Sequence, residues 1–445
     1  MSRVGFADET RIGIAVENDA ELLLRVRERA NLRAAWSRVR ANGLQSSSAR
    51  TRREVGIFGS DEERNLSRLY RKLQQGKFEF EKAIGVPIRR PGKTPRPIVI
   101  SAVQDRIVQR CILNVLQSIP ALADYVKIET SFGGIEERSV RKAIQSIVSA
   151  SQRDGYTYYA RSDISNFFQG IPKDVVIGKI RTLIGDHPEF LRFVRSAMDV
   201  ELRNIAELGA GARHFPSRSI GVVQGGCLSP LLGNILLHDF DMQLNGRGVV
   251  CFCYIDDFIL MGKDKASITK AFHSARTMLS KYGLCVHEPK IGSSKASAGL
   301  IRDGFEFLGC RIVPGLISPN QKSRQRLLAN IRSRFEQSKT YIQKCDQLNY
   351  ARHDLSFSRT MFDVNNSLFS WGNQYSFCND RISMAALQKD VNALVYDYLA
   401  FFRATIRTTE ERRLFRALGM HLLLESKSAP ILWAGVSPDT NQPGG

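Results

Sequence analysis

The sequence predicts an α+β protein in which a small antiparallel sheet is set among long helices. Two apolar runs, 249–253 and 258–261, flank a Tyr-Ile-Asp-Asp tetrapeptide at 254–257 and have the pattern of two strands joined by a tight turn. A second hairpin is indicated over 78–100, where prolines break short apolar pieces. Beyond Pro319 the pattern becomes helical, so strands occupy the middle of the chain and helices its two ends.

The chain of 445 residues is long enough for two or three domains and a large core. Changes in pattern divide it into a basic helical region, a mixed region of strands and helices, a second helical region and a tail rich in Pro and Gly. The boundaries predicted for these four parts are 1–77, 78–318, 319–427 and 428–445.

A formal net charge of +20 indicates a polyanionic partner. Between Arg25 and Arg53 there are nine arginines and one acid, Glu28, and residues 320–344 carry seven Lys or Arg against one Glu. Such an excess draws affinity from phosphate contacts and counterion release, so nucleic acid is the expected partner. A solvated basic surface on an unrelated enzyme is the alternative that the total charge leaves open.

The cysteines and the apolar runs predict a cytoplasmic protein. Eight cysteines are scattered without a Cys-x-x-Cys pair or a zinc-ligand spacing, which is typical of reduced thiols in the cytosol. The first residues form no apolar signal segment, and no stretch approaches the ~18 apolar residues of a membrane span. No membrane partner is therefore expected.

Local signals place the remaining elements. Gly43 ends a basic helix over 19–42, and Ser60 with Glu63 forms a capping box for a helix that continues to Gly76. Apolar periodicity predicts further helices over 104–116, 172–183, 228–244, 267–282, 320–344 and, in several segments, 368–423. Further strands are predicted over 156–160, 284–287 and 305–313.

The adjacent acids Asp256 and Asp257 are the first candidate site. Two carboxylates between apolar strands are costly to bury unless a compensating charge is present. A pair of Mg²⁺ ions would supply that charge and would assist in-line displacement at a phosphoryl group. Asp163, which follows the strand at 156–160, offers the third carboxylate that a site assembled from separate segments requires. A solvated turn is the alternative for an isolated Asp-Asp pair.

A Gly-rich loop at 221–230 lies between these acids in the sequence. Its glycines allow the backbone to approach a bound nucleotide closely, and Gln224, followed by Gly225, offers a bidentate amide. A plain turn is the alternative for such a loop on its own.

Five sequence blocks occur along the chain in a fixed order. They are Asp163 with the following Phe-Phe pair, the 221–230 loop, the Tyr-Ile-Asp-Asp turn, Gly283-Leu284 leading to Lys290, and Phe307-Leu308-Gly309. In this order, over about 84–313, they resemble the blocks of reverse transcriptases. The resemblance implies a right-hand polymerase, with fingers and palm over 78–318 and a helical thumb within 319–427. Residues 35–42 and 105–109 resemble the amino-terminal part of bacterial group II intron reverse transcriptases, and 370–375 part of their thumb.

The resemblance implies a metal site. Asp163, Asp256 and Asp257 correspond to the metal-binding carboxylates of the family, and the Ile164 carbonyl to a further ligand. The implied cofactor is a pair of Mg²⁺ ions, with Mn²⁺ as an alternative. One ion would lower the pKa of a 3′-hydroxyl, and the other would hold the triphosphate and the leaving pyrophosphate.

The resemblance also implies substrate contacts. Phe168 falls where the family keeps a bulky gate against the ribose 2′-hydroxyl, whereas Phe167 fits a core position better. Arg96 corresponds to a fingers cation that holds the triphosphate, and Lys290 to a lysine near the leaving pyrophosphate that can act as general acid. A solvated hairpin Arg and a surface Lys are the alternatives for these two residues.

Nucleic-acid contacts are expected from two further places. The resemblance implies that Gln224 and Gly225 contact the incoming nucleotide or the template, and that the turn at Gly309 grips the primer strand. The basic helix at 320–344 is expected to bind the backbone of the template–primer duplex through its arginines. The candidates are Arg324, Arg326, Arg332 and Arg334.

The implied reaction is template-directed addition of dNTPs to a 3′-hydroxyl, with an RNA template and a DNA product. After Gly43 the chain lacks the Gly-rich segment usual in intron enzymes, and neither a Cys/His-rich nuclease domain nor a ribonuclease H acidic cluster is found. The chain therefore resembles the defence-associated "unknown group" of reverse transcriptases, which implies a dedicated non-coding RNA and a role in anti-phage defence. Three alternatives stay open: a group II intron-encoded maturase, a retron-type enzyme, and a catalytically idle RNA-binding protein. The oligomeric state is also open, with a homo-oligomer among the options.

Overall fold

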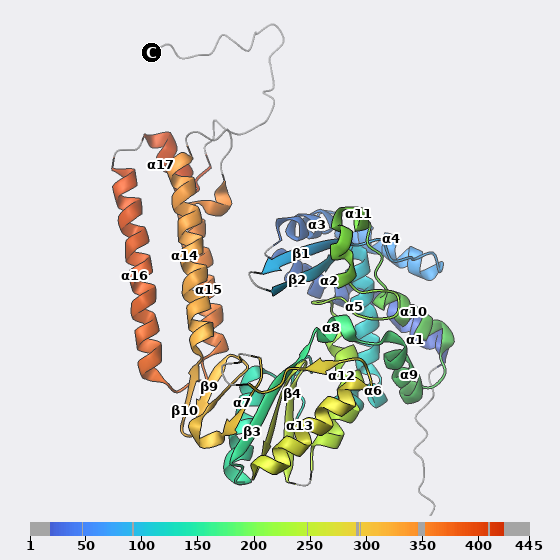
Figure 1. Cartoon of the computed structure of the whole chain (residues 1–445). Helices are drawn as coiled ribbons and strands as arrows, with labels where there is room; N and C mark the ends of the chain where they lie inside the picture. The colour runs from blue at the N-terminus through green and yellow to red at the C-terminus, as the bar shows by residue number, and fades with distance from the viewer. Residues whose placement is uncertain are drawn as a thin grey trace, which may run out of the picture. The chain divides into compact units, whose positions relative to one another are not determined.

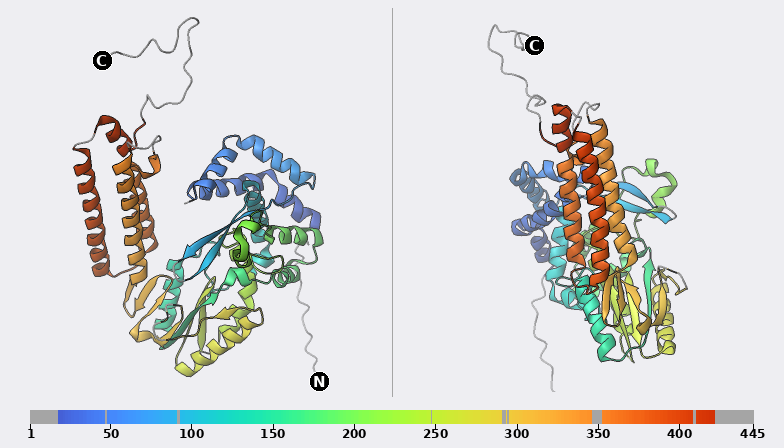
Figure 2. Two further views of the ribbon diagram at one scale, coloured as in Figure 1. Left: turned by 45° about the horizontal axis from the view of Figure 1, so that its top comes forward. Right: turned by 90° about the vertical axis from the view of Figure 1, so that its left-hand side faces the viewer.

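The computed structural model describes residues 18–46, 48–90, 93–246, 248–290, 293, 295–345, 352–407 and 410–421. For residues 89, 90, 93 and 94 the description covers the backbone alone. The tail predicted at 428–445 lies outside these ranges. The chain forms two compact units, residues 1–305 and 306–445, whose elements are labelled in Figure 1 and seen from two further directions in Figure 2.

Four helices open the first unit: α1 (Asp19–Arg27), α2 (Arg29–Leu44), α3 (Ala49–Gly59) and α4 (Glu62–Gln74). The single helix predicted over 19–42 is wrong, because the chain is extended at Glu28 (φ −58°, ψ 138°). The Asn31 side chain donates to the carbonyls of Arg25 and Val26 at 3.0 and 3.4 Å, so it satisfies the end of α1. A side chain in the first turn of α2 thus satisfies the end of α1, and the apolar pattern gave no signal of this break.

The predicted capping box at Ser60 and Glu63 is also wrong. The Ser60 hydroxyl donates to the Ile57 carbonyl at the end of α3, and α4 starts after Asp61 without a side-chain cap. The helix α3 itself was not predicted; Ser48 caps its start by accepting from the Thr51 amide at 3.2 Å.

The predicted hairpin over 78–100 is confirmed. Strand β1 (Ile84–Arg90) pairs antiparallel with β2 (Lys93–Ile100). The helices predicted over 104–116 and 172–183 are confirmed as α5 (Val103–Ser118) and α9 (Lys173–Ile184). The other helices up to residue 214 are α6 (Pro120–Val126), α7 (Val140–Arg153), α8 (Phe167–Gly170), α10 (Pro188–Met198), α11 (Ile205–Leu208) and a 3₁₀ helix, Gly209–His214.

A five-stranded antiparallel sheet forms the centre of the first unit. Its strands are β3 (Tyr158–Ser165), β4 (Val249–Tyr254), β5 (Asp257–Gly262), β6 (Cys285–Val286) and β7 (Ser297–Leu300). The order is β4-β5-β3-β6, and β7 pairs with β3 on the same edge as β6. The hairpin predicted around residues 254–257 is confirmed. The strand β3 continues to Ser165, so Asp163 lies within the strand and not after it.

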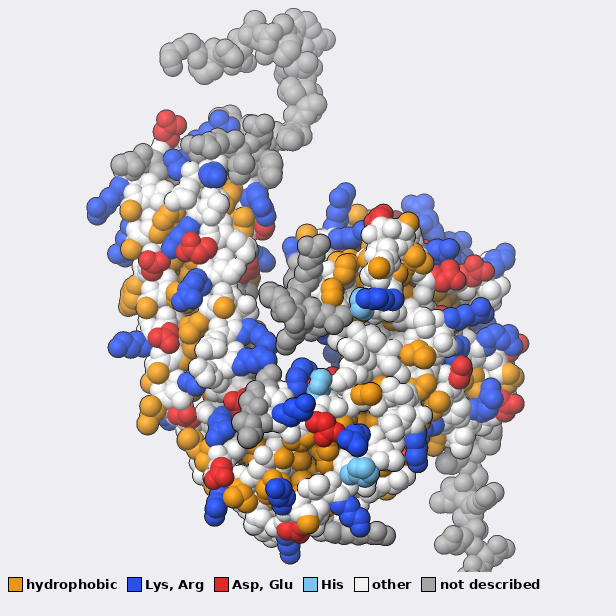
Figure 3. Space-filling model, viewed as in Figure 1, with side chains coloured by type: hydrophobic (Ala, Val, Ile, Leu, Met, Phe, Trp, Pro, Cys, Tyr) orange, Lys and Arg blue, Asp and Glu red, His pale blue; other side chains and the backbone are white. Residues whose placement is uncertain are grey.

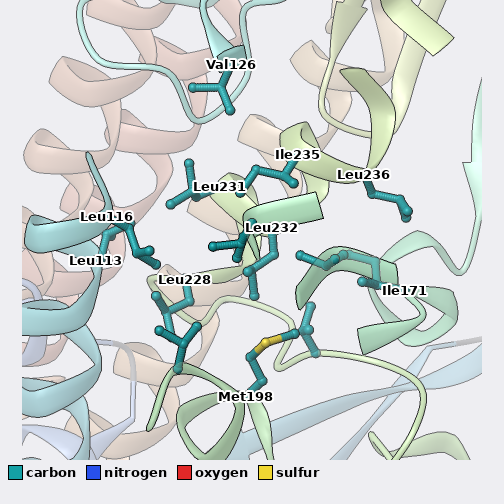
Figure 4. Packing of buried hydrophobic residues seen from close by; sticks show 14 of the residues in the cluster. Leu113, Leu116, Val126, Ile171, Met198, Leu228, Leu231, Leu232, Ile235 and Leu236 are labelled. Atoms are coloured by element: carbon teal, nitrogen blue, oxygen red, sulfur yellow. The ribbon is translucent and has the colours of Figure 1, made fainter. Parts of the chain in front are cut away.

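Two helices, α12 (Ser229–Leu244) and α13 (Lys265–Ser280), pack against this sheet. Apolar residues occur all around α12, as expected for a helix enclosed by other elements. Figure 4 shows Leu231, Leu232, Ile235 and Leu236 of α12 among residues of α5, α6 and α10 that belong to the same buried cluster. The core of the first unit is therefore continuous from the sheet to the N-terminal helices.

The second unit combines a small sheet with a helical bundle. The strands β8 (Phe305–Phe307), β9 (Cys310–Val313) and β10 (Leu316–Pro319) pair in the order β10-β9-β8, and β8 starts at the last residue of the first unit. The helices are α14 (Gln321–Lys344), α15 (Phe357–Gln374), α16 (Arg381–Ile406) and α17 (Glu411–Leu418), which confirm the helical C-terminal pattern. Stacked aromatic rings join them, with Phe335 against Tyr398 at 4.4 Å and Phe357 against Phe402 at 4.0 Å between ring centroids.

Two remaining expectations concern thiols and membranes. All eight cysteines are free thiols. Within the described ranges, no helix combines the length and the apolar character needed to cross a membrane.

Candidate active site

One row of cross-strand pairs places two of the predicted acids side by side. Asp163 in β3 pairs with Asp257 in β5, and Asp257 pairs in turn with Tyr254 in β4. Directly opposite residues on antiparallel strands point to the same face with Cβ atoms about 5 Å apart. The register of the sheet therefore brings together carboxylates that are 93–94 residues apart in the chain.

The third acid, Asp256, is held by the turn between β4 and β5. Ile255 precedes it with a φ of 59°, a conformation that is strained for a β-branched residue. Gly133 packs against this turn so closely that a Cβ there would lie 2.3 Å from Ile255 Cγ1. The Asn234 amide donates to the Gly133 carbonyl at 2.9 Å, and the Ile164 amide donates to the Asp256 carbonyl at 2.8 Å. Contacts from three segments thus fix the turn that carries the acid.

The turn carboxylates are poorly compensated. Burial raises the pKa of Asp256, and Arg96 opposes this shift through its positive charge. Burial, followed by repulsion from Asp256, raises the pKa of Asp257 to about 6, and Arg161 opposes it. Adjacent carboxylates that are partly buried without a close counter-charge are candidates for a functional site.

Asp163 differs from its neighbours because it has a close cationic partner. One of its carboxylate oxygens pairs with the Lys295 ammonium. The other oxygen lies 3.5 Å from His287 Nε2, which is itself 2.8 Å from the Ser165 hydroxyl. Sequence reasoning missed both residues. Lys295 lies outside the five blocks, and His287, although it lies between Leu284 and Lys290, gave no signal of its own; the pairing of β3 with β6 and β7 brings them here.

The residues fit a divalent cation, although no group of three or more His, Cys, Asp or Glu side chains in the described ranges is arranged to hold one. Asp163 Oδ1 is buried and has no hydrogen-bond partner, so one of its lone pairs is available. Carboxylate oxygens are the ligands that Mg²⁺ prefers. Asp163, Asp256 and Asp257 would hold the ions, and the main chain of Ile164 lies beside Asp256.

The predicted sugar gate and the Gly-rich loop are joined in the structure. Phe167 is buried in the core with 2% exposure, whereas Phe168 is partly buried and packs against the edge of that core. The Val222 amide donates to the Phe168 carbonyl at 2.8 Å, so the loop is attached to the segment that follows β3. Gln224 Oε1 is buried without a hydrogen-bond partner, and Gly225 is exposed with a φ of 85°. An unpaired buried amide oxygen is costly unless a ligand supplies a donor.

Arg96 and Lys290, the two cations predicted to contact the triphosphate or the pyrophosphate, lie in different surroundings. Arg96 in β2 is exposed and near enough to Asp256 to lower the pKa of that acid. Lys290 is exposed and lines an open pocket beneath α13 together with Tyr158 and Ala160. The structure therefore places Arg96 near Asp256, whereas Lys290 lines the pocket beneath α13.

In the second unit, the turn at Gly309 is one that only glycine fits. Gly309 has a φ of 80°, and a Cβ added to it would lie 2.6 Å from the Tyr375 hydroxyl. The Tyr375 hydroxyl donates to Ser323 Oγ at 3.0 Å, and the Gly309 carbonyl accepts from the Asn320 amide at 2.8 Å. The turn is thereby fixed to the start of α14.

The four arginines predicted on α14 are not equivalent. Arg326 and Arg332 are exposed, whereas Arg324 is half-buried. Arg334 is half-buried and pairs with Asp363 of α15. Figure 3 shows Lys and Arg side chains interspersed with Asp and Glu along the helices of this unit. Arg326 and Arg332 are therefore the candidates that solvent reaches most freely.

The chain is similar to known proteins over the part that contains the three acids. The profile of the reverse transcriptase (RNA-dependent DNA polymerase) family matches residues 88–312, a range that contains all three acids. YkfC of Escherichia coli K12 is 26% identical over 278 residues, which are 54% of this chain and 69% of YkfC. The group II intron-encoded protein LtrA of Lactococcus lactis is 26% identical over 187 residues, which are 40% of this chain but only 28% of LtrA.

Among solved structures, telomerase from Candida albicans in complex with a fragment of telomeric RNA aligns with 82% of this chain and 64% of that chain, at 14% identity and a TM-score of 0.41. The family match covers half of the chain and confirms the fold class predicted from the sequence blocks. The chain belongs to the reverse transcriptase family.

Proposed function

We propose that this chain extends a 3′-hydroxyl with dNTPs on an RNA template, using a two-metal site at Asp163, Asp256 and Asp257. The observation that carries the proposal is the pairing of Asp163 with Asp257 beside a second, partly buried acid. Two bound Mg²⁺ ions would activate the attacking hydroxyl and stabilise the leaving pyrophosphate. The protein's part is to hold the carboxylates in one row before substrate arrives.

Other residues would place the nucleotide. Arg96, which acts electrostatically on Asp256, is suited to neutralise the triphosphate. The unpaired Oε1 of Gln224 is suited to accept a hydrogen bond from a nucleotide or the template. The partly buried ring of Phe168, joined to the same loop, is suited to exclude a 2′-hydroxyl.

The decisive experiment replaces both turn acids. Asp256→Ala with Asp257→Ala should abolish dNTP incorporation on a primed RNA template, because the ligands of the ions are lost while the strands that flank the turn stay. RNA binding and circular dichroism of the same preparation serve as controls and should stay near wild type. A double variant that still polymerises would overturn the proposal and favour the idle RNA-binding protein.

A second experiment tests sugar selection. Phe168→Ala should admit ribonucleotides while folding normally, because its ring is only partly buried. The matched variant Phe167→Ala removes a core ring and should lower the free energy of unfolding by about 3–5 kcal/mol. Unchanged discrimination between dNTPs and ribonucleotides in Phe168→Ala would assign the gate to another residue.

We further propose that the N-terminal helices bind a dedicated RNA. Several arginines there are neutralised, such as Arg33 by Glu63 and Arg40 by Glu62. By contrast, the exposed residues Arg38, Arg53 and Arg68 have no acidic partner within the described ranges. Unpaired exposed arginines are suited to phosphate contacts.

Sequencing the RNA that copurifies with the chain tests this partner. A single abundant non-coding RNA would support the proposed anti-phage role, whereas intron RNA would favour a maturase, and a structured RNA joined to DNA would favour a retron-type enzyme. Phage plating with the double alanine variant then tests whether defence needs polymerisation.

A further inference from the structure

The five-stranded sheet of the first unit, here called the palm sheet, brings a lysine to one of the three candidate metal-binding carboxylates. Strand β7 pairs with β3 so that Ala298 lies opposite Ala160 and Ser297 opposite Arg161. Lys295 lies two residues before β7 and His287 one residue after β6, on the edge of β3 away from Asp257. The pairing of these strands with β3 therefore brings Lys295 to Asp163, where the two side chains form an ion pair.

The main chain around Lys295 is anchored while its side chain is accessible. Ser293 Oγ accepts from the amides of Lys295 and Ala296, both at 3.2 Å, and Ala296 is fully buried. The Lys295 side chain is 48% exposed, against 14% for Asp163. A lysine has four rotatable bonds, so its ammonium can leave the carboxylate without any movement of the strand.

An ammonium and a divalent cation cannot share one carboxylate without repulsion. We propose that Lys295 is a built-in counter-ion of Asp163 that competes with the catalytic metal, and that it occupies this carboxylate until the metal displaces it. The inference rests on the proposed metal site. In this role Lys295 compensates the charge of the Asp163 carboxylate in the metal-free protein. It also raises the metal concentration that is needed to fill the site.

The experiment measures metal binding directly, without nucleic acid or dNTP. The purified full chain is titrated with Mn²⁺, and free Mn²⁺ is read by electron paramagnetic resonance. Lys295→Met should tighten Mn²⁺ binding by about two- to fivefold, which is the range expected from losing a half-exposed ion pair. Lys295→Gln, which can still donate a hydrogen bond but has no charge, should tighten it similarly, and Lys295→Arg should resemble wild type.

Two controls separate the inference from the metal site itself. Lys281→Met removes an exposed lysine at the end of α13 and should leave Mn²⁺ affinity unchanged. Asp163→Asn should weaken Mn²⁺ binding. If Asp163→Asn binds like wild type, the proposed metal site is wrong and the inference falls with it. If Asp163→Asn loses affinity while Lys295→Met and Lys295→Gln do not gain it, the metal site stands and the competition is refuted.

Thermal unfolding supplies a second readout. In the presence of a chelator, Lys295→Met should melt at a lower temperature than wild type, because a mostly buried carboxylate has lost its partner. Saturating Mn²⁺ should remove most of that difference, because a ligand that binds the folded state stabilises it in proportion to its affinity. An equal loss of melting temperature with and without Mn²⁺ would mean that Lys295 only fastens β7 to β3.

Discussion

The palm sheet of the first unit and the helical bundle of the second unit differ in whether their acids have cationic partners. In the bundle, acids that face other helices are paired, as Asp363 is with Arg334 and Asp397 with Lys339 at 2.7 Å. At the end of the palm sheet, neither Asp256 nor Asp257 has an ion pair within the described residues, and the pKa of each is raised by burial.

The difference separates charges that are compensated within the fold from charges that the proposed function assigns to metal binding. A paired charge is already compensated by a partner within the protein. A charge that is partly buried and uncompensated lowers the free energy of unfolding unless a ligand binds. Charge alone would have pointed to the basic α14, but the uncompensated acids are in the palm. This is why the site lies where charge is poorly satisfied and not where it is most abundant.

Neutralising one acid in each region tests whether the acids of the sheet affect activity and those of the bundle affect stability. Asp257→Asn should lower dNTP incorporation at least about 100-fold, since a metal ligand contributes several kcal/mol to the transition state. Its free energy of unfolding should not fall, because a buried charge has been removed. Asp363→Asn should show the reverse, with incorporation kept at excess template–primer and stability lowered by about 1 kcal/mol. Loss of stability in Asp257→Asn would mean that its charge is compensated after all.

Asp105, a buried acid outside the candidate site, extends the comparison to the pH dependence of stability. Asp105 in α5 is 2% exposed and accepts from the Glu81 amide at 3.0 Å, and burial raises its pKa to about 7. A carboxyl with a raised folded-state pKa contributes stability that is complete at acid pH and is lost as the pH rises through about 7. Wild type should therefore lose on the order of 2 kcal/mol between pH 5 and pH 8 relative to Asp105→Asn.

Urea unfolding of both proteins at several pH values measures this difference. The asparagine can still accept from the Glu81 amide, so it removes the titration and keeps the hydrogen bond. Parallel stability curves for the two proteins across this range would show that Asp105 is ionised in the folded state at pH 5 as well.

The smallest expected effects concern the arginines of α14. Arg334→Gln should lower stability by about 1 kcal/mol and leave the salt dependence of duplex binding unchanged, because its partner is Asp363. Arg326→Gln with Arg332→Gln should leave stability unchanged and flatten that salt dependence by roughly one unit of slope per lost phosphate contact. Duplex affinity at several salt concentrations decides between them, and an unchanged slope in the double variant would make both arginines a solvated surface.

Sequence reasoning was strongest where one local pattern carried the information. The Tyr-Ile-Asp-Asp turn between two apolar runs predicted the β4–β5 hairpin, and the basic stretch at 320–344 predicted the helix α14. It failed at two helix ends, where a side-chain hydrogen bond to a nearby carbonyl sets the boundary. Asn31 ends α1, and Ser60 bonds to α3 instead of capping α4.

The residues of the candidate site could likewise be predicted only in part from the sequence. Order along the chain was enough to select Asp163, Asp256 and Asp257, but it also selected Lys290, which lies in no strand and lines the pocket beneath α13. Lys295 depends on the register between β3 and β7, and β7 is a Ser-Ala-Gly-Leu segment without strand propensity. The ion pair of Arg334 likewise depends on an acid in another helix. Registers and helix contacts of this kind are set by tertiary packing, which one sequence does not display.

The strained turn at Ile255 has a consequence for how the enzyme comes into being. A left-handed β-branched residue persists only while its surroundings hold it, and here they are the bare backbone of Gly133 and the Asn234 amide that fixes it. Both come from segments more than 20 residues from the turn, so an isolated hairpin lacks the contacts that hold this shape. We therefore expect the acids to reach these positions only after the surrounding segments of the first unit have packed against the turn.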